Sequence, residues 1–334
     1  MLIDNPTQTG NKMPSIEELS QQVAKLQQTV EVLSRTGISS GQMKVQSISV
    51  QVSDRTRCNA GCKFCISRTT PADRKDTVSE SILDFNRLEV GLEFAKRGGA
   101  YTAILTGKAD PLQESPTYIG ELIRTCKQYL PTVDMHTNGF VFHEKPNFLS
   151  NFQNHGLTMI TFSIAHHKSA RNSQLMRLRS DYDPWEQVRL AQKLGLMVRC
   201  SVVLCKAGVN DLASLLDYIE TAKIAGAHQV VVRELWLPDR IESSDHDVFD
   251  WNRHNKVLLE TLYNEVLQKA EQSNSLIKFV RYLPWGTAVF EINGMNVTFA
   301  RCEESYNGGT LKSLVHRIDG HGYMDWDHTG SILY

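Results

Sequence analysis

Six short runs rich in β-branched residues alternate with amphipathic helical patterns through the central part of this 334-residue chain. Strands that alternate with helices favour a parallel sheet with right-handed crossover connections. Six such units, rather than the eight of a closed barrel, predict an α/β fold with a partial (β/α)6 barrel and a site at the C-terminal ends of its strands. The six runs are VQSISVQV (45–52), YTAILTG (101–107), VDMHTNG (133–139), TMITFSIA (158–165), MVRCSVVL (197–204) and HQVVVREL (228–235).

The segment 1–43 is interpreted as an N-terminal tail and helix that precede the barrel, which is expected over 44–245. Ser15 and Glu18 are spaced as a capping box, which marks the start of a helix. Apolar residues then recur at steps of three and four over 16–33. This seam predicts a helix that packs on its own domain or pairs with a partner protein or a second copy of the chain.

The segment 246–334 is expected to form a C-terminal helix, at about 250–272, followed by a β-rich lid. The run FEINGMNVTF (290–299) contains an Asn-Gly pair, which is typical of a β-hairpin. Because a partial barrel leaves a lateral opening, we expect this tail to pack near the barrel mouth and to contribute substrate contacts through aromatic side chains. These aromatic residues are Trp285, Tyr306, Tyr323 and Trp326.

The composition excludes several classes of protein. The formal net charge is −1, so no strong field points to nucleic acid, and no nucleic-acid partner is expected. The sequence has no run of eighteen apolar residues and no apolar signal segment, so we expect a cytoplasmic protein without a membrane partner. Seven cysteines, three of them clustered, fit a reducing compartment and a metal site better than a disulfide framework.

The three clustered cysteines, Cys58, Cys62 and Cys65, are spaced C-x3-C-x2-C in the loop after the first predicted strand. Thiolates select zinc or an iron–sulfur cluster. A structural zinc site needs a fourth ligand, and no second C-x2-C or H-x3-H pair follows. A [4Fe–4S] cluster held by three cysteines keeps one iron open for a substrate or cofactor. The triplet therefore favours such a cluster.

These cysteines, with Phe64 before the third, resemble the signature of the radical S-adenosylmethionine (SAM) superfamily. The resemblance extends over about residues 45–240 and is closest to the MoaA-like and peptide-modifying branch. It implies an enzyme in which the open iron binds SAM. An electron from an external flavodoxin- or ferredoxin-type donor would then cleave SAM to a 5′-deoxyadenosyl radical, which abstracts hydrogen from the substrate.

The resemblance also implies which residues contact SAM. AILTGKADPL stands where the branch has a Gly-Gly-Glu-Pro turn, but the turn is one residue longer here and its carboxylate comes only at Asp110. Arg199 would bind the SAM carboxylate through two parallel hydrogen bonds. The full set of implied cofactor contacts is Phe64, Thr106, Gly107, Asp110, Thr137, Ser163, Arg199 and Ser201.

Cys302 is the only cysteine beyond residue 205, so a second cluster is not expected. Cys302 is a candidate hydrogen donor to a substrate radical, or an inert buried thiol. His166 and His167 end the fourth predicted strand and are substrate-side candidates or solvated loop residues.

Three functions are compatible with these features. The first is modification of a ribosomally made precursor peptide by epimerisation, cross-linking or backbone excision. The second is radical chemistry on a small metabolite or nucleotide, although no Gly-rich phosphate loop is present. The third is a non-catalytic cluster protein that pairs through the 16–33 helix.

Overall fold

The computed structural model describes residues 44–53, 58–69, 83–237, 246–284, 286–301, 306–307, 310–326 and 330–334. The predicted 16–33 helix lies outside these residues, as do Cys302 and Trp285. None of the described helices is both long enough and apolar enough to cross a membrane.

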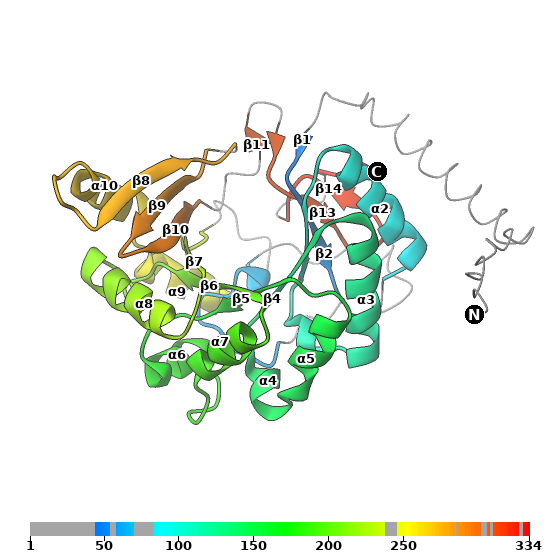
Figure 1. Ribbon diagram of the computed structural model, residues 1–334, viewed down its shortest axis with the longest axis horizontal. Helices are drawn as coiled ribbons and strands as arrows, with labels where there is room; N and C mark the ends of the chain where they lie inside the picture. The colour runs from blue at the N-terminus through cyan, green and yellow to red at the C-terminus, as the bar shows by residue number, and fades with distance from the viewer. Residues whose placement is uncertain are drawn as a thin grey trace, which may run out of the picture.

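The six predicted strands are present and form one parallel array (Figure 1). Each strand pairs with its neighbours in sequence order, which is the arrangement expected of successive βα units. The prediction of a partial barrel is therefore confirmed. The strands are β2 (Ser47–Gln51), β3 (Thr102–Thr106), β4 (Thr132–Thr137), β5 (Met159–Ser163), β6 (Met197–Val203) and β7 (Gln229–Arg233).

Helices surround this array on its outer side (Figure 1). Several begin at a side chain that caps the first backbone N–H groups: Asp84 before α2, Ser115 before α3 and Asp211 before α8. The helices are α2 (Phe85–Arg97), α3 (Pro116–Tyr129), α4 (Phe140–Glu144), α5 (Asn147–Asn154), α6 (Ser169–Met176), α7 (Pro184–Lys193) and α8 (Leu212–Ile224), with short 3₁₀ turns η1 (Ile66–Arg68) and η2 (Pro111–Gln113).

The two faces of the barrel strands differ in chemistry. Residues such as Ile48, Leu105 and Val198 point to the helices and are fully buried in the main hydrophobic core. The opposite, inner face is mostly polar, and many of its side chains keep partial solvent exposure. Closed (β/α)8 barrels usually fill this space with branched apolar residues. Inner-face polar residues include Ser49, Gln51, Thr102, Thr106, Asp134, His136, Thr161, Ser163, Arg199, Ser201, Gln229 and Arg233.

The C-terminal segment first extends the barrel beyond β7. Strand β10 (Met295–Ala300) pairs in parallel with β7, and β9 (Ala288–Ile292) and β8 (Ile277–Tyr282) follow antiparallel. The predicted hairpin turn is confirmed, because Asn293 and Gly294 both have positive φ. The single helix expected at 250–272 is instead two, α9 (His246–Asn255) and α10 (Leu259–Ala270).

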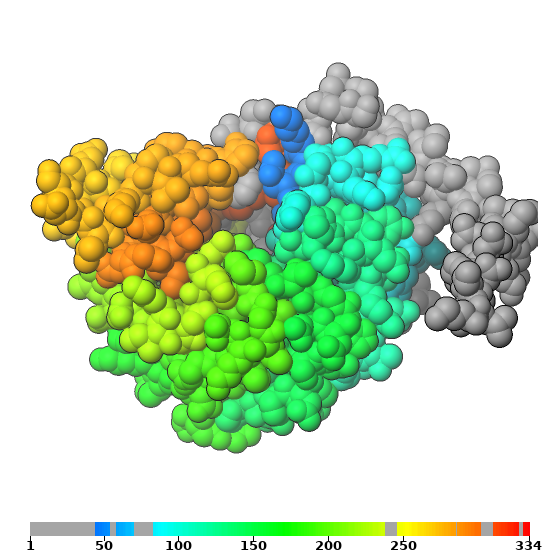
Figure 2. Space-filling model, viewed as in Figure 1, coloured from blue at the N-terminus to red at the C-terminus, as the bar shows by residue number. Residues whose placement is uncertain are grey.

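The chain then crosses to the other edge of the barrel. Strand β13 (Leu314–His316) pairs in parallel with β2, and β14 (Gly322–Tyr323) pairs with β13. A small second sheet joins β1 (Lys44–Val45), β12 (Thr310–Leu311) and β11 (Tyr306–Asn307). Figure 2 shows the orange strands of the extension beside the yellow-green part of the barrel. The tail thus continues the sheet at both edges, an arrangement the sequence did not predict.

Candidate functional site

The cysteine loop lies beyond the C-terminal end of β2 and is held mainly by backbone contacts with α6. Gly61 N donates to Met176 O at 2.9 Å, and Lys63 N donates to Leu175 O at 3.1 Å. Both acceptors belong to the last turn of α6, where helix carbonyl groups lack partners within the helix. The loop is therefore fixed to the barrel through main-chain atoms.

The three thiols of this loop are partly buried and lie close enough to influence one another. Burial raises the pKa of Cys58 to about 11, with smaller contributions from the Asp110 carboxylate and Cys65. Burial, followed by the charges of Cys65 and Cys58, raises the pKa of Cys62 still more. A thiol must lose its proton to bind a metal, so the raised pKa values of Cys58 and Cys62 are a cost that a bound cationic group would have to offset.

The donor set fits an iron–sulfur cluster better than one metal ion. In the part of the chain that the structure describes, no three His, Cys, Asp or Glu side chains are arranged to hold a single metal ion. A [4Fe–4S] cluster makes a different demand, because each thiolate binds a different iron. Next to Cys58, the buried Nδ2 of Asn59 has no hydrogen-bond partner among these residues. An amide donor beside the thiols is suited to the sulfur atoms of a cluster.

Asp110 and Thr137, two implied SAM contacts, bind each other instead of pointing freely into the mouth. The buried Asp110 carboxylate accepts from Thr137 Oγ1 at 2.9 Å and from the backbone N of Asn138 at 2.6 Å and Leu112 at 3.0 Å. Burial raises the pKa of Asp110, although these hydrogen bonds oppose the rise. The structure shows that both side chains join the turn after β3 to the end of β4. Their assignment as SAM contacts stays a prediction.

Asn138, which the sequence analysis did not single out, connects this turn to the cysteine loop. Its Nδ2 lies 2.8 Å from Asn59 Oδ1 and 3.7 Å from Cys58 Sγ. Asn59 N in turn donates to Gln113 Oε1 at 3.1 Å. The sequence signal for this residue was the Asn-Gly pair directly after a predicted strand. Such a pair is typical of a tight turn, in which the Asn side chain bonds to nearby backbone and Gly takes a positive φ.

The implied contacts on β3, β5 and β6 lie at or near the C-terminal end of the barrel. Thr106 and Gly107 are half-buried, and Ser163 is exposed. A Cβ atom at Gly107 would meet its nearest neighbours at 3.6 Å, so space alone does not require glycine there. Ser201 Oγ accepts from Arg233 Nε at 2.9 Å, which adds a cation at the end of β7. These residues are placed as the resemblance implies, and their contacts with SAM stay predictions.

Arg199 lies lower in the barrel and has protein partners. Its Nη1 donates to Asp134 Oδ2 at 3.2 Å, and its Nε donates to Gln229 Oε1 at 3.0 Å. In sequence, Arg199 precedes the mouth-level Ser201 by two residues on the same face. The structure thus gives the guanidinium a role in neutralising a buried carboxylate, and contact with the SAM carboxylate stays a prediction.

Phe64 packs near Trp251 of α9, with ring centroids 6.3 Å apart.

The two adjacent histidines after β5, His166 and His167, have ring centroids 4.3 Å apart. Burial, then the neighbouring His167, lowers the pKa of His166 to about 4. Of the sequence-predicted residues, Cys302 lies outside the described residues.

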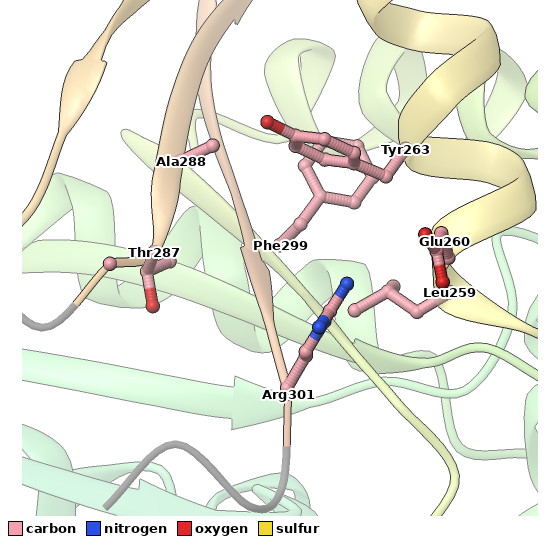
Figure 3. A pocket seen from close by; sticks show the side chains of 8 residues that line it. Leu259, Glu260, Tyr263, Thr287, Ala288, Phe299 and Arg301 are labelled. Carbon is pink, nitrogen blue, oxygen red and sulfur yellow. The ribbon is translucent and has the colours of Figure 1, made fainter. Parts of the chain in front are cut away.

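A cavity of about 210 Å³ lies away from the cysteines, between α10 and the β9–β10 hairpin. Figure 3 shows the rings of Tyr263 and Phe299 on one side and Arg301 extending toward Leu259 and Glu260. Arg301 directly follows β10, whose last residue Ala300 pairs with Arg233 at the end of β7. The cavity therefore lies at the level of the C-terminal strand ends, on the outer face of the sheet that α10 covers.

Comparison with known proteins identifies the class of this site. The family model of the radical SAM superfamily matches residues 52–219, half of the chain. The chain belongs to this superfamily, whose members are enzymes that use a [4Fe–4S] cluster and SAM. A comparison with curated proteins gave no match.

Two solved structures of SuiB from Streptococcus suis resemble this fold. SuiB bound to the precursor peptide SuiA is 15% identical, covers 96% of this chain and 67% of that chain, and has a TM-score of 0.56. SuiB bound to S-adenosylmethionine is 14% identical, covers 94% of this chain and 65% of that chain, and has a TM-score of 0.50. The chain spans about two thirds of the length of SuiB, and at this identity the likeness concerns the fold.

Proposed function

We propose that this radical SAM enzyme modifies a peptide and uses a single cluster held by Cys58, Cys62 and Cys65. When bound, the cluster supplies the electron that cleaves SAM. The remaining site residues bind the cofactor at the mouth and shape the space in which the substrate lies. Ser163, Ser201 and Arg233 provide polar contacts at the strand ends.

The polar, partly exposed inner face of the barrel carries this proposal. Partial exposure indicates a wet interior in which an incoming chain can replace water. Peptide N–H and C=O groups need hydrogen-bond partners wherever they leave water. The alternating Ser, Thr, Gln, Arg and His side chains of β2 to β7 can supply such partners. SuiB, whose fold resembles this one, has been solved bound to its precursor peptide, which is consistent with this class of substrate.

The C-terminal extension is the second part of the proposal. We assign the cavity beside Arg301 and Tyr263 to recognition of a substrate segment outside the reaction centre, because it lies at the level of the C-terminal strand ends and combines apolar walls with charged groups. This assignment keeps the expectation that the tail contributes substrate contacts. It replaces a cover over the mouth with a cavity on the outer face of the sheet.

The test is anaerobic incubation of the reconstituted enzyme with SAM, a reductant and synthetic peptides encoded near its gene. Peptide-dependent formation of 5′-deoxyadenosine, with a mass change in the peptide, is expected. The Cys58→Ala variant is the matched control and should give neither product. Turnover of a small metabolite or nucleotide, with no response to any peptide, would assign the enzyme to the other substrate class. Absence of SAM cleavage under all conditions would favour a non-catalytic cluster protein.

A further inference from the structure

Asn138 is held in one orientation by contacts on every polar group that it carries. Its backbone N donates to Asp110 Oδ2 at 2.6 Å, and its backbone O accepts from Tyr182 Oη at 2.6 Å. The side-chain Oδ1 accepts from Phe140 N at 2.9 Å. Because a backbone N–H can only donate, this last contact fixes which end of the amide is oxygen. The Nδ2 end therefore faces the cysteine loop.

The amide of Asn59 is oriented by the same reasoning. Its Oδ1 accepts from Asn138 Nδ2 at 2.8 Å, so its Nδ2 is directed elsewhere. That nitrogen is buried and has no partner among the described residues, although buried donors are nearly always satisfied. Asn59 is adjacent to Cys58 in sequence, which places an unused N–H donor beside the first cluster ligand.

Cluster binding changes what the Cys58 sulfur can do. As a thiol, Cys58 donates to Asn59 Oδ1 at 3.3 Å. As a cluster ligand it has lost this proton and can only accept. Asn138 Nδ2, at 3.7 Å from Sγ, is then the amide donor directed at the ligand sulfur. The hydrogen bond that Cys58 Sγ donates to Asn59 Oδ1 is therefore lost, while the one that Asn138 Nδ2 donates to Cys58 Sγ is kept.

We propose that Asn138 and Asn59 form an amide pair that donates N–H hydrogen bonds to the sulfur atoms around Cys58 and raises the reduction potential of the cluster. The cluster becomes more negative when it is reduced. The positive ends of fixed N–H dipoles stabilise that extra charge, and hydrogen bonds to sulfur are an established determinant of cluster potential. Asn138 is a positioning residue in this account. The inference depends on the cluster and not on the identity of the substrate.

An EPR-monitored redox titration of the reconstituted, SAM-free enzyme tests this inference. Asn138→Ala, which removes the donor, should have a more negative midpoint potential than the wild-type enzyme. Asn138→Asp, which also adds an acidic oxygen, should be at least as negative as Asn138→Ala. Gln153→Glu is the matched control. It makes the same chemical change on α5, where Gln153 bonds to Leu194 O, and should leave the potential unchanged.

Potentials equal to that of the wild-type enzyme, or more positive, in both Asn138 variants would overturn the proposal. If these variants fail to assemble a cluster, pulsed EPR of the reduced wild-type enzyme tests instead whether the amide nitrogens contact the cluster. Asparagine labelled with ¹⁵N at the side-chain amide should show a ¹⁵N coupling to the cluster. The absence of that coupling would equally overturn the proposal.

Discussion

Asp134 of β4 and Arg199 of β6 form an ion pair on the inner face of the barrel, with Nη1 and Oδ2 3.2 Å apart. The intervening strand β5 contributes Thr161, whose hydroxyl donates to the same carboxylate at 3.0 Å. The Asp134 side chain is only 1% exposed, whereas that of Arg199 is 25% exposed. The pair therefore joins three neighbouring strands at one buried carboxylate.

We predict that Arg199→Ala lowers the free energy of unfolding by about 1–3 kcal/mol, because the buried carboxylate then loses one of its two basic partners and keeps only His136. Urea denaturation measures this loss. Arg189→Ala removes an ion pair of similar length, 3.3 Å, whose side chains are 45% and 33% exposed, and should cost about 0–1 kcal/mol. Equal losses of unfolding free energy in the two variants would show that the inner ion pair stabilises the fold no more than the outer one. Unchanged stability together with weaker SAM binding would restore the predicted role at the cofactor.

The same carboxylate predicts a pH dependence of stability. Burial alone would raise the pKa of Asp134, but His136, Arg199 and Thr161 together hold it below the ordinary value. A lowered folded-state pKa stabilises the fold fully above the unfolded-state pKa of about 3.9, and this contribution is lost as the pH falls through the folded-state pKa. Asp134→Asn should therefore lose less stability than the wild type between about pH 5 and pH 2. Urea denaturation at a series of pH values measures this. An equal loss of unfolding free energy in Asp134→Asn and in the wild-type protein between about pH 5 and pH 2 would contradict the prediction.

Gly139, which follows the amide pair, has a φ of 75°. A Cβ atom there would lie 2.8 Å from both Phe162 Cε1 and Tyr182 Oη. Gly139→Ala should combine this overlap with backbone strain and cost at least about 1–3 kcal/mol in thermal or urea unfolding. Gly195→Ala is the matched control, because Gly195 has a φ of 77° and no neighbouring atom within 4 Å. A loss of stability no larger than that of Gly195→Ala would show that Phe162 and Tyr182 shift to make room for the added methyl group.

Phe290 of β9 lies at the centre of an aromatic group within the C-terminal extension. It is fully buried, and its ring contacts those of Tyr263, Phe279 and Phe299. Phe290→Ala should cost about 3–5 kcal/mol in urea unfolding. Phe279→Ala, in the same group but 40% exposed, should cost roughly 1 kcal/mol or less. A small effect of Phe290→Ala would mean that the neighbouring rings of the extension close around the missing side chain.

The cysteine prediction separates cluster ligands from other thiols. Replacing any one of Cys58, Cys62 and Cys65 with Ala should abolish the cluster and SAM cleavage. Cys126→Ala, at a buried thiol of α3, should preserve both. Anaerobic reconstitution followed by iron analysis should give about four irons per chain. Seven or eight irons would contradict the single-cluster proposal.

The barrel could be predicted from the sequence because its signals are local. β-Branched runs and helix caps such as Ser115 and Asp211 act within a few residues, and so does the Asn293-Gly294 turn of the extension. The break between α9 and α10 could not be predicted, because Lys256-Val257-Leu258 contains neither Gly nor Pro. The pairing of β10 with β7 and of β13 with β2 depends on partners far along the chain.

The three candidate cluster cysteines could also be picked out from the sequence, since their spacing is a local signal, but their surroundings could not be predicted. The amide pair depends on a contact between residues 59 and 138, in two different loops. One signal was missed: Asp134 and Arg199 are charged residues within the predicted strands VDMHTNG and MVRCSVVL. A charge in such a run must be paired if it is buried. That rule would have predicted the inner ion pair.

The order in which the sheet can be completed follows from the pairing of β13 with β2. Leu314 lies opposite Ile48, so one edge of the strand that leads into the cysteine loop receives its partner only after Leu314, far along the chain, has been synthesised. Contacts of such large sequence separation form slowly, and an unpaired strand edge invites association with other chains in the meantime. Iron loaded onto the nascent polypeptide would meet this loop beside an open edge. Maturation of the metal centre is therefore expected to be most efficient after β13 has paired with β2.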